Sequence, residues 1–525
     1  MDSSEVIAGI KNKIPGFNAL SVSRDYPDEI TIKVRAQDFK DTCLLLHKIL
    51  PSSVMMLFAC DERGDSAKFV INSVFLNLKK SQWIIVSMDI PQDDPCFDSL
   101  AKSVYSASLF EREIREMFGI EPKGNPDLRR LRLHDEVCPP DNFPLRKDFQ
   151  KMDPGQLSEY KFDRVEGVGV FEVPVGPVHA GIIGPGHFRF SVAGEPIINL
   201  EIRLGFTHRG VEKIFEGKPC RNAVRLSECV SGDSSFAHSL AFTQAAEKIF
   251  GVSVPAQAAY LRAIFLELER MYNHVNDIGG IALDVGFSFP AAYASIIKES
   301  MLQLNDKLTG SRYLKNVNTV GGVLTGIDET KKQMLLRSLK SLKKDFSELT
   351  KILYSSVSFM DRVDTTGLLR RKTAEDLGAV GLSARACGIP MDLRKYFSGV
   401  YKEAGFKMAL QESGDVLARL RIRVLEFEES CRLIEEFARK LNKDGEITSE
   451  LKPRGGSALG YSEGWRGPVL YWLKTDPTGQ IRRCKVVDPS FFNWQGLSYA
   501  VLGNIIPDFP LCNKSFDLSY SGNDL

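Results

Sequence analysis

The residues best suited to chemistry fall in two short stretches, 225–251 and 514–525. Cys229 is the only thiol in either stretch, and the other candidates carry a hydroxyl, an imidazole or no side chain: Ser231, Gly232, Ser234, His238, Ser519 and Gly522. A soft transition metal prefers thiolate ligands, and a serine hydroxyl stays protonated near neutral pH. If the stretches meet in the fold, they predict a composite site suited to hydrogen bonds or a neutral ligand.

Histidines offer a second kind of chemistry. The imidazole titrates near physiological pH and is suited to proton transfer. The candidates along the chain are His179, His187, His208 and His238. A histidine in a folded core more often serves as a structural hydrogen-bonding group, so both interpretations stay open for each of them.

Both stretches resemble the metal-binding motifs of a known family. CVSGDSSFAHS is similar to RVCGICGFAHS in the large subunit of NiFe hydrogenases, specifically the energy-converting, membrane-bound group related to respiratory complex I. The C-terminal DLSYSG is similar to the family's DPCYSC. The resemblance places the four nickel-binding cysteines at Ser231, Ser234, Ser519 and Gly522, and a glutamate implicated in proton movement at Gly184. It implies a hydrogenase-like body in which this chain binds no metal.

The same segments of this chain also resemble the quinone-reducing subunit of complex I. Its quinone-contacting tyrosine falls at Gly232 and its quinone-contacting histidine at Ile183, so both groups are absent. Arg466, in GWRG, lies where hydrogenases keep an arginine close to the metal, although a lone arginine is more often a surface or salt-bridge residue. We expect the family's cavity to persist, lined by small and hydroxylic residues, with room for water or a ligand.

Composition narrows the class of protein. A net charge of +1 argues against a nucleic-acid binder dominated by phosphate contacts,. The apolar runs are too short to cross a bilayer, and the N-terminus lacks the basic start and apolar stretch of a signal peptide,. The ten cysteines are scattered without a CxxC pair, which fits a reducing cytosol,. We expect a cytoplasmic protein that partners hold on the inner face of the cell membrane.

Residues 1–150 predict a small α/β-sheet domain. Helical patterns cover 5–14, 38–50 and 98–118, and strand patterns cover 29–34, 54–60, 69–76 and 83–88,. Gly119 is a natural left-handed cap for the last helix. The arginine-rich and proline-rich segment that follows is typical of a solvated basic loop or of an extended arm on another surface.

This segment also carries a resemblance. ERE..EMFGI....NPDLRRL and PLRKDF are similar to the signature of the complex I 30 kDa-type subunit, with Asn125 in place of a family histidine. In energy-converting hydrogenases the same domain precedes the large subunit, which is the order found in this chain. The resemblance therefore implies a fusion of the two subunits.

Residues 151–165 are polar and predict a linker, and residues 166–525 predict a mainly α-helical bundle domain with peripheral β-hairpins,. Helical patterns begin after Pro255 and cover 291–309, 329–359 and 417–434, and strand patterns cover 168–173, 188–192, 197–202, 469–474 and 481–487,. The expected fold class is α+β, similar to the NiFe hydrogenase large subunit and the complex I 49 kDa subunit.

Three functions follow from these observations. The chain is the large subunit of a complex I-like, ion-translocating oxidoreductase without nickel, or a coupling subunit with no chemistry of its own, or a hydrogenase with unfamiliar ligands. The third is the least favoured because neither stretch offers alternative soft donors. The sequence holds no cluster, flavin or haem motif, so the resemblance implies partners: an iron–sulfur small subunit, a ferredoxin-like subunit and antiporter-like membrane subunits,.

Overall fold

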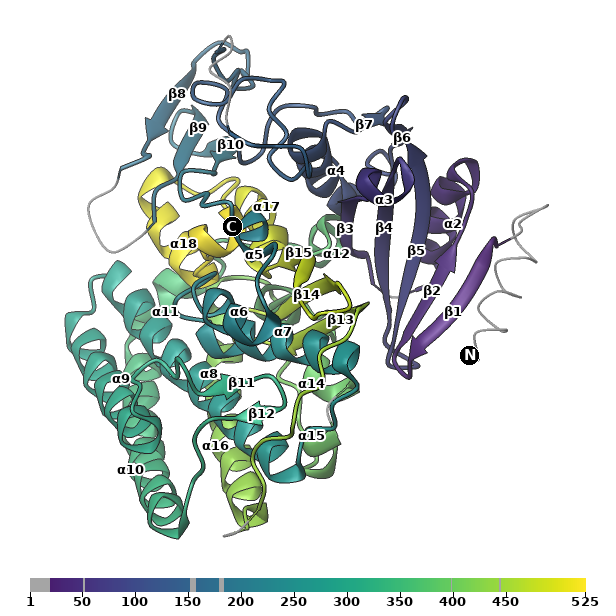
Figure 1. The fold of residues 1–525 in the computed structure, drawn as a ribbon. Coiled ribbons are helices and arrows are strands. Elements are labelled where there is room, and N and C mark those ends of the chain that lie inside the picture. Colours follow the sequence, from purple (N-terminus) through teal and green to yellow (C-terminus); the bar gives the residue numbers. More distant parts are fainter. Residues whose placement is uncertain (1–18, 51, 152–156, 179–183, 398, 443–444) are drawn as a thin grey trace.

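The computed structural model describes residues 19–50, 52–151, 157–178, 184–397, 399–442 and 445–525. A sheet domain at the N-terminus lies beside a larger helical body, and a small sheet lies at one end of the molecule (Figure 1). That sheet consists of β8 (Val170–Val175), β9 (His187–Ala193) and β10 (Ile197–Arg203). This arrangement confirms the expected α+β class. The helix expected at 5–14 lies outside the described residues.

The N-terminal domain is built on a five-stranded sheet with the strand order β1-β2-β5-β4-β3. Its strands are β1 (Ser21–Tyr26), β2 (Glu29–Lys33), β3 (Val54–Asp61), β4 (Lys68–Asn77) and β5 (Gln82–Pro91). The pair β2 and β5 is parallel, and the other pairs are antiparallel. The connection from β2 to its parallel partner β5 runs through α2 (Ala36–Ile49), β3 and β4,.

The last helix of this domain is shorter than the sequence predicts. Helix α4 spans Tyr105–Phe118, so the expected start at residue 98 is wrong. Residues 96–98 instead form β6 (Cys96–Asp98), which pairs with β7 (Glu121–Lys123) beyond the helix and draws the chain into an extended conformation. The expected end is confirmed, because Gly119 adopts a left-handed conformation with φ of 67°,.

The segment after β7 is an extended arm that docks on the helical body. Arg132 is only 4% exposed. Its Nε donates to the backbone oxygen of Asn523 at 3.0 Å, and its guanidinium forms an ion pair with Glu113 at 2.9 Å. The carboxylate of Glu116 accepts from the backbone N–H groups of Leu131 and Arg132. These contacts exclude a solvated loop and confirm an arm that lies on another surface.

Side chains also anchor the described part of the expected linker. Residues 157–165 contain no helix or strand. The Tyr160 ring lies under the Arg203 guanidinium at 4.3 Å, and the Phe162 ring lies under Arg189 at 4.1 Å. Both arginines belong to the sheet of β8 (Val170–Val175), β9 (His187–Ala193) and β10 (Ile197–Arg203). The hairpin expected between the last two strands is confirmed.

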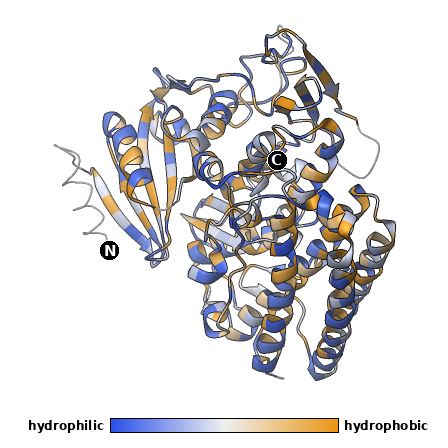
Figure 2. Cartoon of the chain, turned by 180° about the vertical axis from the view of Figure 1, so that it is seen from behind, coloured by the Kyte–Doolittle hydropathy of each residue, from blue (hydrophilic) through white to orange (hydrophobic). Residues whose placement is uncertain are grey.

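Four long helices make the bundle. They are α8 (Ala256–Asp284), α9 (Ser288–Thr309), α10 (Glu329–Ser355) and α16 (Val416–Lys440). Hydrophilic and hydrophobic residues alternate along the outer helices, as in amphipathic helices (Figure 2),. The single helix expected at 329–359 is wrong, because the extended Ser356 ends α10 and its hydroxyl caps α11 (Val357–Val363),.

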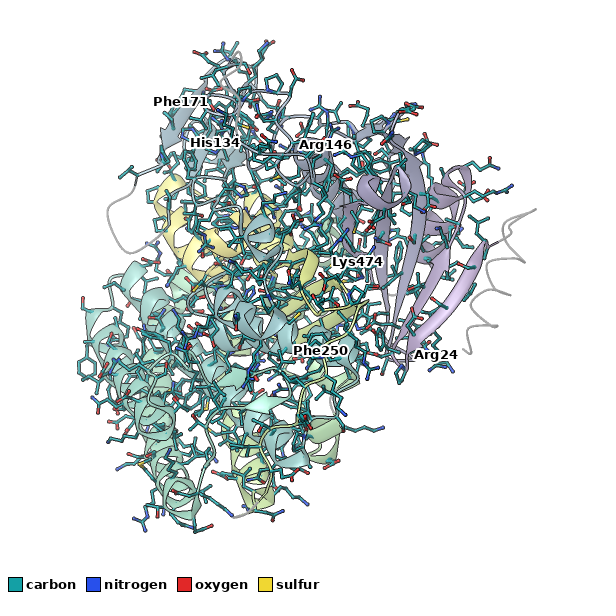
Figure 3. The ribbon with its side chains drawn as sticks, viewed as in Figure 1. Arg24, His134, Arg146, Phe171, Phe250 and Lys474 are labelled. Atoms are coloured by element: carbon teal, nitrogen blue, oxygen red, sulfur yellow. The ribbon has the colours of Figure 1, made fainter. Side chains whose placement is uncertain are left out.

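A three-stranded sheet joins the bundle to the N-terminal domain. The hairpin of β14 (Pro468–Thr475) and β15 (Ile481–Val487) confirms the prediction, and β13 (Gly456–Glu463) adds a strand that the sequence did not predict. Helix α7 (Ser235–Phe250) packs on this sheet. Lys474, which Figure 3 labels at the domain boundary, forms an ion pair with Glu62 at 2.6 Å.

Candidate functional site

The two chemically suited stretches meet, as expected. Ser231 lies in the loop between α6 (Cys220–Ser227) and α7, and Ser519 is the N-cap residue of the C-terminal helix α19 (Tyr520–Asp524). Their hydroxyl oxygens are 2.8 Å apart. Both serines are buried, Ser231 being 1% exposed. We call this meeting point, formed by positions 231, 234, 519 and 522, the centre.

The first stretch is held in place by a buried carboxyl group from α8. Glu269 accepts from the backbone N–H of Phe236 at 2.6 Å and from that of Ala237 at 3.0 Å. These are orphan donors of the first turn of α7, so Glu269 satisfies them from a neighbouring helix. Burial raises the pKa of Glu269 to about 8, although both hydrogen bonds oppose the rise.

Arg466 brings a cation to the centre. Its two terminal nitrogens bind both oxygens of Asp233, at 2.8 and 2.6 Å, and one of them lies 3.3 Å from Ser234 Oγ. Its Nε donates to the backbone oxygen of Asp517. Burial alone would raise the pKa of Asp233, but Arg466 holds that pKa below its ordinary value,. The guanidinium thus binds residues from both stretches.

His238 is the middle residue of a buried series of hydrogen bonds near the centre. Its Nδ1 is 2.9 Å from Tyr471 Oη, and its Nε2 is 3.0 Å from Asp488 Oδ2. A neutral ring that accepts from the tyrosine hydroxyl and donates to the carboxylate satisfies both contacts. Burial would raise the pKa of Asp488, and the hydrogen bond from His238 together with the charge of Arg466 lowers it.

A pair of aspartates, Asp277 and Asp517, lies close to Arg466. Asp277 of α8 hydrogen-bonds Asp517, and the two carboxyl groups are flanked by Arg423 and Lys514 at 2.9 and 2.7 Å. Burial and the neighbouring charge of Asp517 raise the pKa of Asp277 to about 7, while Arg423 opposes them,. The pKa of Asp517 is shifted the other way: burial would raise it, but the charges of Lys514 and Arg466 lower it,.

These residues do not fit a NiFe centre. Such a site needs soft thiolate ligands, and the centre offers hydroxyls, carboxylates and a guanidinium,. Within the described ranges, no group of three or more histidine, cysteine, aspartate or glutamate side chains is placed to hold a metal ion. Arg466 and Asp233 already satisfy one another through two hydrogen bonds at this place,.

The centre is also closed, which corrects the expected cavity. Ser231 and Ser519 touch, and the Asp488 carboxyl group lies where a side chain at position 522 would begin, 2.7 Å from the Cβ that a non-glycine residue would place there. Arg466, from the loop between β13 and β14, and Asp488, directly after β15, lie against these positions. The sequence missed Asp233, Tyr471, Asp488 and Asp517 as parts of this site.

Comparisons with known proteins agree with this architecture. Residues 32–154 match the family described as Respiratory-chain NADH dehydrogenase, 30 Kd subunit, and residues 284–454 match its 49 Kd subunit. Residues 209–277 match the Nickel-dependent hydrogenase family. Hydrogenase-4 component G of Escherichia coli (strain K12) is 32% identical, over 99% of this chain and 92% of that protein. The chain belongs to the family of complex I-related hydrogenase large subunits.

One further relative and one solved structure are similar to this large subunit. Formate hydrogenlyase subunit 5 of Escherichia coli (strain K12) is 30% identical, over 99% of the large subunit and 92% of that protein. A chain of the membrane-bound sulfane sulfur reductase, an archaeal respiratory membrane complex, shares the fold with a TM-score of 0.64 at 23% identity. That alignment covers 70% of the large subunit and 100% of the other chain.

The remaining candidates of this large subunit lie around the centre rather than in it. His208 Nδ1 lies 2.7 Å from the Asp524 backbone oxygen, and burial lowers its pKa. His187, on β9, has its Nδ1 3.3 Å from the backbone oxygen of Gly176. Gly232 is exposed. His179 lies outside the described residues, as does residue 183.

Gly184, which stands at the family's glutamate position, lies against the C-terminal helix. A Cβ at this position would come within 2.7 Å of the Cβ and ring of Tyr520. Gly184 has no left-handed φ, so space and not backbone conformation demands the glycine. The large subunit therefore has no room for a glutamate in this arrangement.

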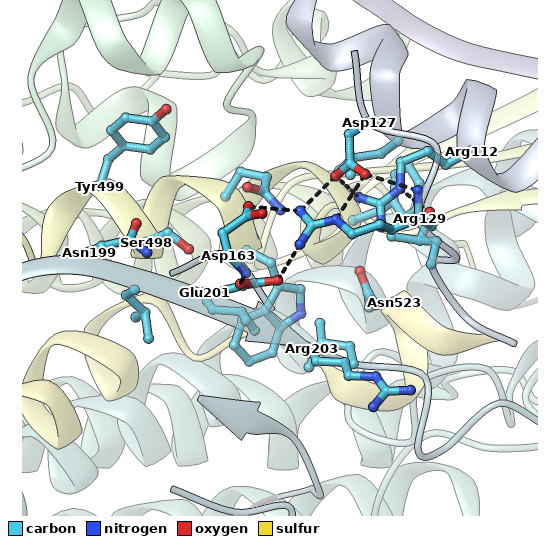
Figure 4. Close-up of a pocket in the computed structure, with 18 of the residues that line it drawn as sticks. Arg112, Asp127, Arg129, Asp163, Asn199, Glu201, Arg203, Ser498, Tyr499 and Asn523 are labelled. Atoms are coloured by element: carbon cyan, nitrogen blue, oxygen red, sulfur yellow. Dashed lines mark hydrogen bonds and ion pairs between the residues drawn. The ribbon is translucent and has the colours of Figure 1, made fainter. Parts of the chain in front are cut away.

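A separate cavity lies at the seam of the two domains. It measures about 330 Å³ and is bounded by the arm, β10 and α17 (Ser490–Ala500) (Figure 4). Arg129 crosses it and binds Asp127, Asp163 and Glu201 at 2.9, 3.1 and 2.8 Å. The four ligand positions are not among its lining residues. Because Arg129 is paired with carboxylates of the chain itself, we interpret this cavity as a gap at the contact between the domains and not as a second functional site.

Proposed function

We propose that this chain is the large subunit of a membrane-associated, complex I-like oxidoreductase that works without a NiFe centre. It accepts electrons from an iron–sulfur partner and takes part in coupling electron transfer to ion translocation. The observation that supports the proposal is the centre itself. All four ligand positions converge, yet they hold three hydroxyls and a glycine locked by Arg466 and Asp488.

The partners in this proposal follow from what the chain lacks. The sequence has no CxxC pair or dinucleotide-binding glycine motif, so redox groups come from other subunits,. We assign an iron–sulfur small subunit, a ferredoxin-like subunit and antiporter-like membrane subunits to the assembly. None of the described helices is both long and apolar enough to span a bilayer, so membrane attachment is assigned to those subunits, on the cytoplasmic face.

The closed centre favours a second candidate function. With Ser231 against Ser519 and Asp488 against Gly522, no room for an electron acceptor remains at the four ligand positions. In this alternative the chain is a coupling subunit that holds electron-transfer and membrane subunits in register. It performs no chemistry of its own.

Isolation of the native assembly tests the metal-free proposal. The copurifying chains are identified by mass spectrometry, and nickel is measured by elemental analysis. We expect iron in multiples set by the iron–sulfur partners and nickel far below one atom per large subunit. Stoichiometric nickel would overturn the proposal and restore the hydrogenase alternative.

A blocking substitution separates the two candidate functions. Gly232 is exposed, and none of the described residues lies within 4 Å of a Cβ placed there, so Gly232→Trp is compatible with the fold. If an acceptor is reduced at the centre, this change lowers the rate of menadione reduction by reduced ferredoxin at least roughly tenfold, about 1.4 kcal/mol of barrier. Gly64→Trp, at an equally open glycine of the N-terminal domain, is the control. An unchanged rate in both variants supports the coupling subunit.

A further inference from the structure

Gly522 is a glycine for reasons of space. It lies inside the helix α19 and has no left-handed φ, so its backbone conformation suits any residue. A Cβ at this position would lie 2.7 Å from Cγ and 2.7 Å from Oδ2 of Asp488, and 3.0 Å from Ser519 Oγ. Contacts below 3.0 Å do not occur for real Cβ atoms. The carboxyl group of Asp488 therefore occupies the volume into which a side chain at 522 would extend.

Asp488 is held too firmly to move aside. Its Oδ2 accepts from His238 Nε2 at 3.0 Å, and its Oδ1 accepts from the backbone N–H of Ser490 at 2.7 Å. His238 is fixed in turn by the Tyr471 hydroxyl at 2.9 Å. Asp488 is 1% exposed, and His238 and Tyr471 are 0% exposed. A displaced carboxylate would leave buried polar groups without partners, which is costly.

We propose that Asp488 and Gly522 are a matched pair, in which the carboxyl group of Asp488 excludes a metal-binding thiolate from position 522. The exclusion has two causes. The carboxyl group fills the volume of the missing side chain, and its negative charge would oppose a thiolate at van der Waals distance. Asp488 thus determines specificity at the centre, although it stands outside both ligand-bearing stretches. This inference rests on the proposed metal-free function.

The geometry makes a double-mutant cycle the decisive test. Thermal unfolding of the full chain is measured for Gly522→Ala, Asp488→Ala and the combination. We expect G522A to lower Tm on the order of 5 °C, because it overpacks a buried site. The loss for the double variant should be clearly smaller than the sum of the two single losses, because Asp488→Ala makes room for the new methyl group.

Two controls isolate the cause. Gly232→Ala places a methyl group where the described part of the chain has no atom within 4 Å, so its Tm should stay within about 1 °C of the wild type,. Asp488→Asn keeps the volume and removes the charge, so it should give G522A no relief. Three results would each overturn the proposed matched pair. They are additive losses of Tm in the cycle, a relief of G522A by D488N equal to that by D488A, and a G522A variant as stable as G232A.

The pair and the proposed function fail in different ways. Stoichiometric nickel in the native assembly refutes the metal-free function even if the double-mutant cycle shows coupling. Additive losses refute the matched pair even if the assembly contains no nickel. The two measurements use the same protein and share no readout.

Discussion

At the residue scale, hydrogen bonds and charged groups connect the four positions at which the similar family binds its metal. Ser231 and Ser519 make a direct hydrogen bond where thiolates would bind a metal. Arg466 supplies positive charge, and Asp233 neutralises it through two hydrogen bonds. The groups that a metal would have held together are therefore held together by hydrogen bonds and charge.

Removal of Arg466 tests how much its hydrogen bonds and charge stabilise the centre. Arg466→Ala leaves Asp233 and the Asp517 backbone oxygen without their guanidinium, so we expect a loss of roughly 2 to 3 kcal/mol in the free energy of unfolding. The loss is below that of a fully buried pair because the Asp233 side chain is 40% exposed,. Urea unfolding measures it. Arg371→Ala, which breaks the exposed pair with Glu375, should cost at most about 0.5 kcal/mol,.

The same interaction has a pH signature. The pKa of Asp233 is lowered in the folded chain, so its stabilising contribution is present above the ordinary aspartate pKa and is lost as pH falls through the lowered value,. In R466A the acid side of the stability profile should therefore be flatter than in the wild type. A wild-type and a variant profile that run parallel below pH 5 would contradict this account.

At the element scale, the N-terminus of α7 is the structure that positions the first stretch. Its first-turn N–H groups point at Glu269 of α8, so the two helices fix one another at the edge of the centre. A side chain from another helix can serve as a cap when the helix's own first turn offers none, and Ser234 makes no side-chain capping bond here,.

Glu269→Ala should destabilise the fold and change its pH dependence. The backbone N–H groups of Phe236 and Ala237 lose their acceptor, which costs about 1 to 3 kcal/mol at low pH. The raised pKa of about 8 means that the contribution of Glu269 is fully present below the ordinary glutamate pKa and declines as pH rises through about 8,. Unfolding measured from pH 5 to 9 should show a steeper decline for the wild type than for E269A. Equal slopes would contradict the buried, protonated carboxyl group.

At the scale of the whole molecule, buried charges join the two domains. Lys485 of β15 is 0% exposed and binds Glu113 of α4 and Glu212 of α5 (Val211–Phe215). Lys248 of α7 binds Asp28 and Glu29 of the N-terminal domain at 2.7 and 2.6 Å. Such contacts need both domains at once, so we expect the chain to unfold as a unit across this boundary.

Lys485→Met tests whether these buried charges make the two domains unfold together. The change keeps the length of the side chain and leaves two buried carboxylates without their shared cation, which should cost about 3 to 5 kcal/mol. Thermal unfolding should show one transition shifted down, or the sheet domain melting first. Lys343→Met breaks an exposed pair with Glu435 and should cost no more than about 1 kcal/mol,. A K485M variant as stable as K343M would refute the buried junction.

The sequence by itself determined the elements with strong periodicity. The bundle helices, the strands β2 to β5 of the N-terminal sheet and the left-handed cap at Gly119 follow from local patterns that act within a few residues, whereas the edge strand β1 was not predicted,. The motif comparison also located the ligand positions, whose side chains are read directly from the sequence. What failed locally were the start of α4, the break at Ser356 and the strand β13, where pairing with distant segments or a single cap overrides propensity,.

Only the tertiary structure decided what fills the centre. Asp488 and Tyr471 stand in segments whose sequence carries no signal for this site, and they reach it because α7 packs on β13 and β14. The sequence shows that sulfur is absent at the four positions. Whether the resulting space stays open or is filled depends on side-chain volumes contributed by distant strands, and close packing of the interior fills it here,.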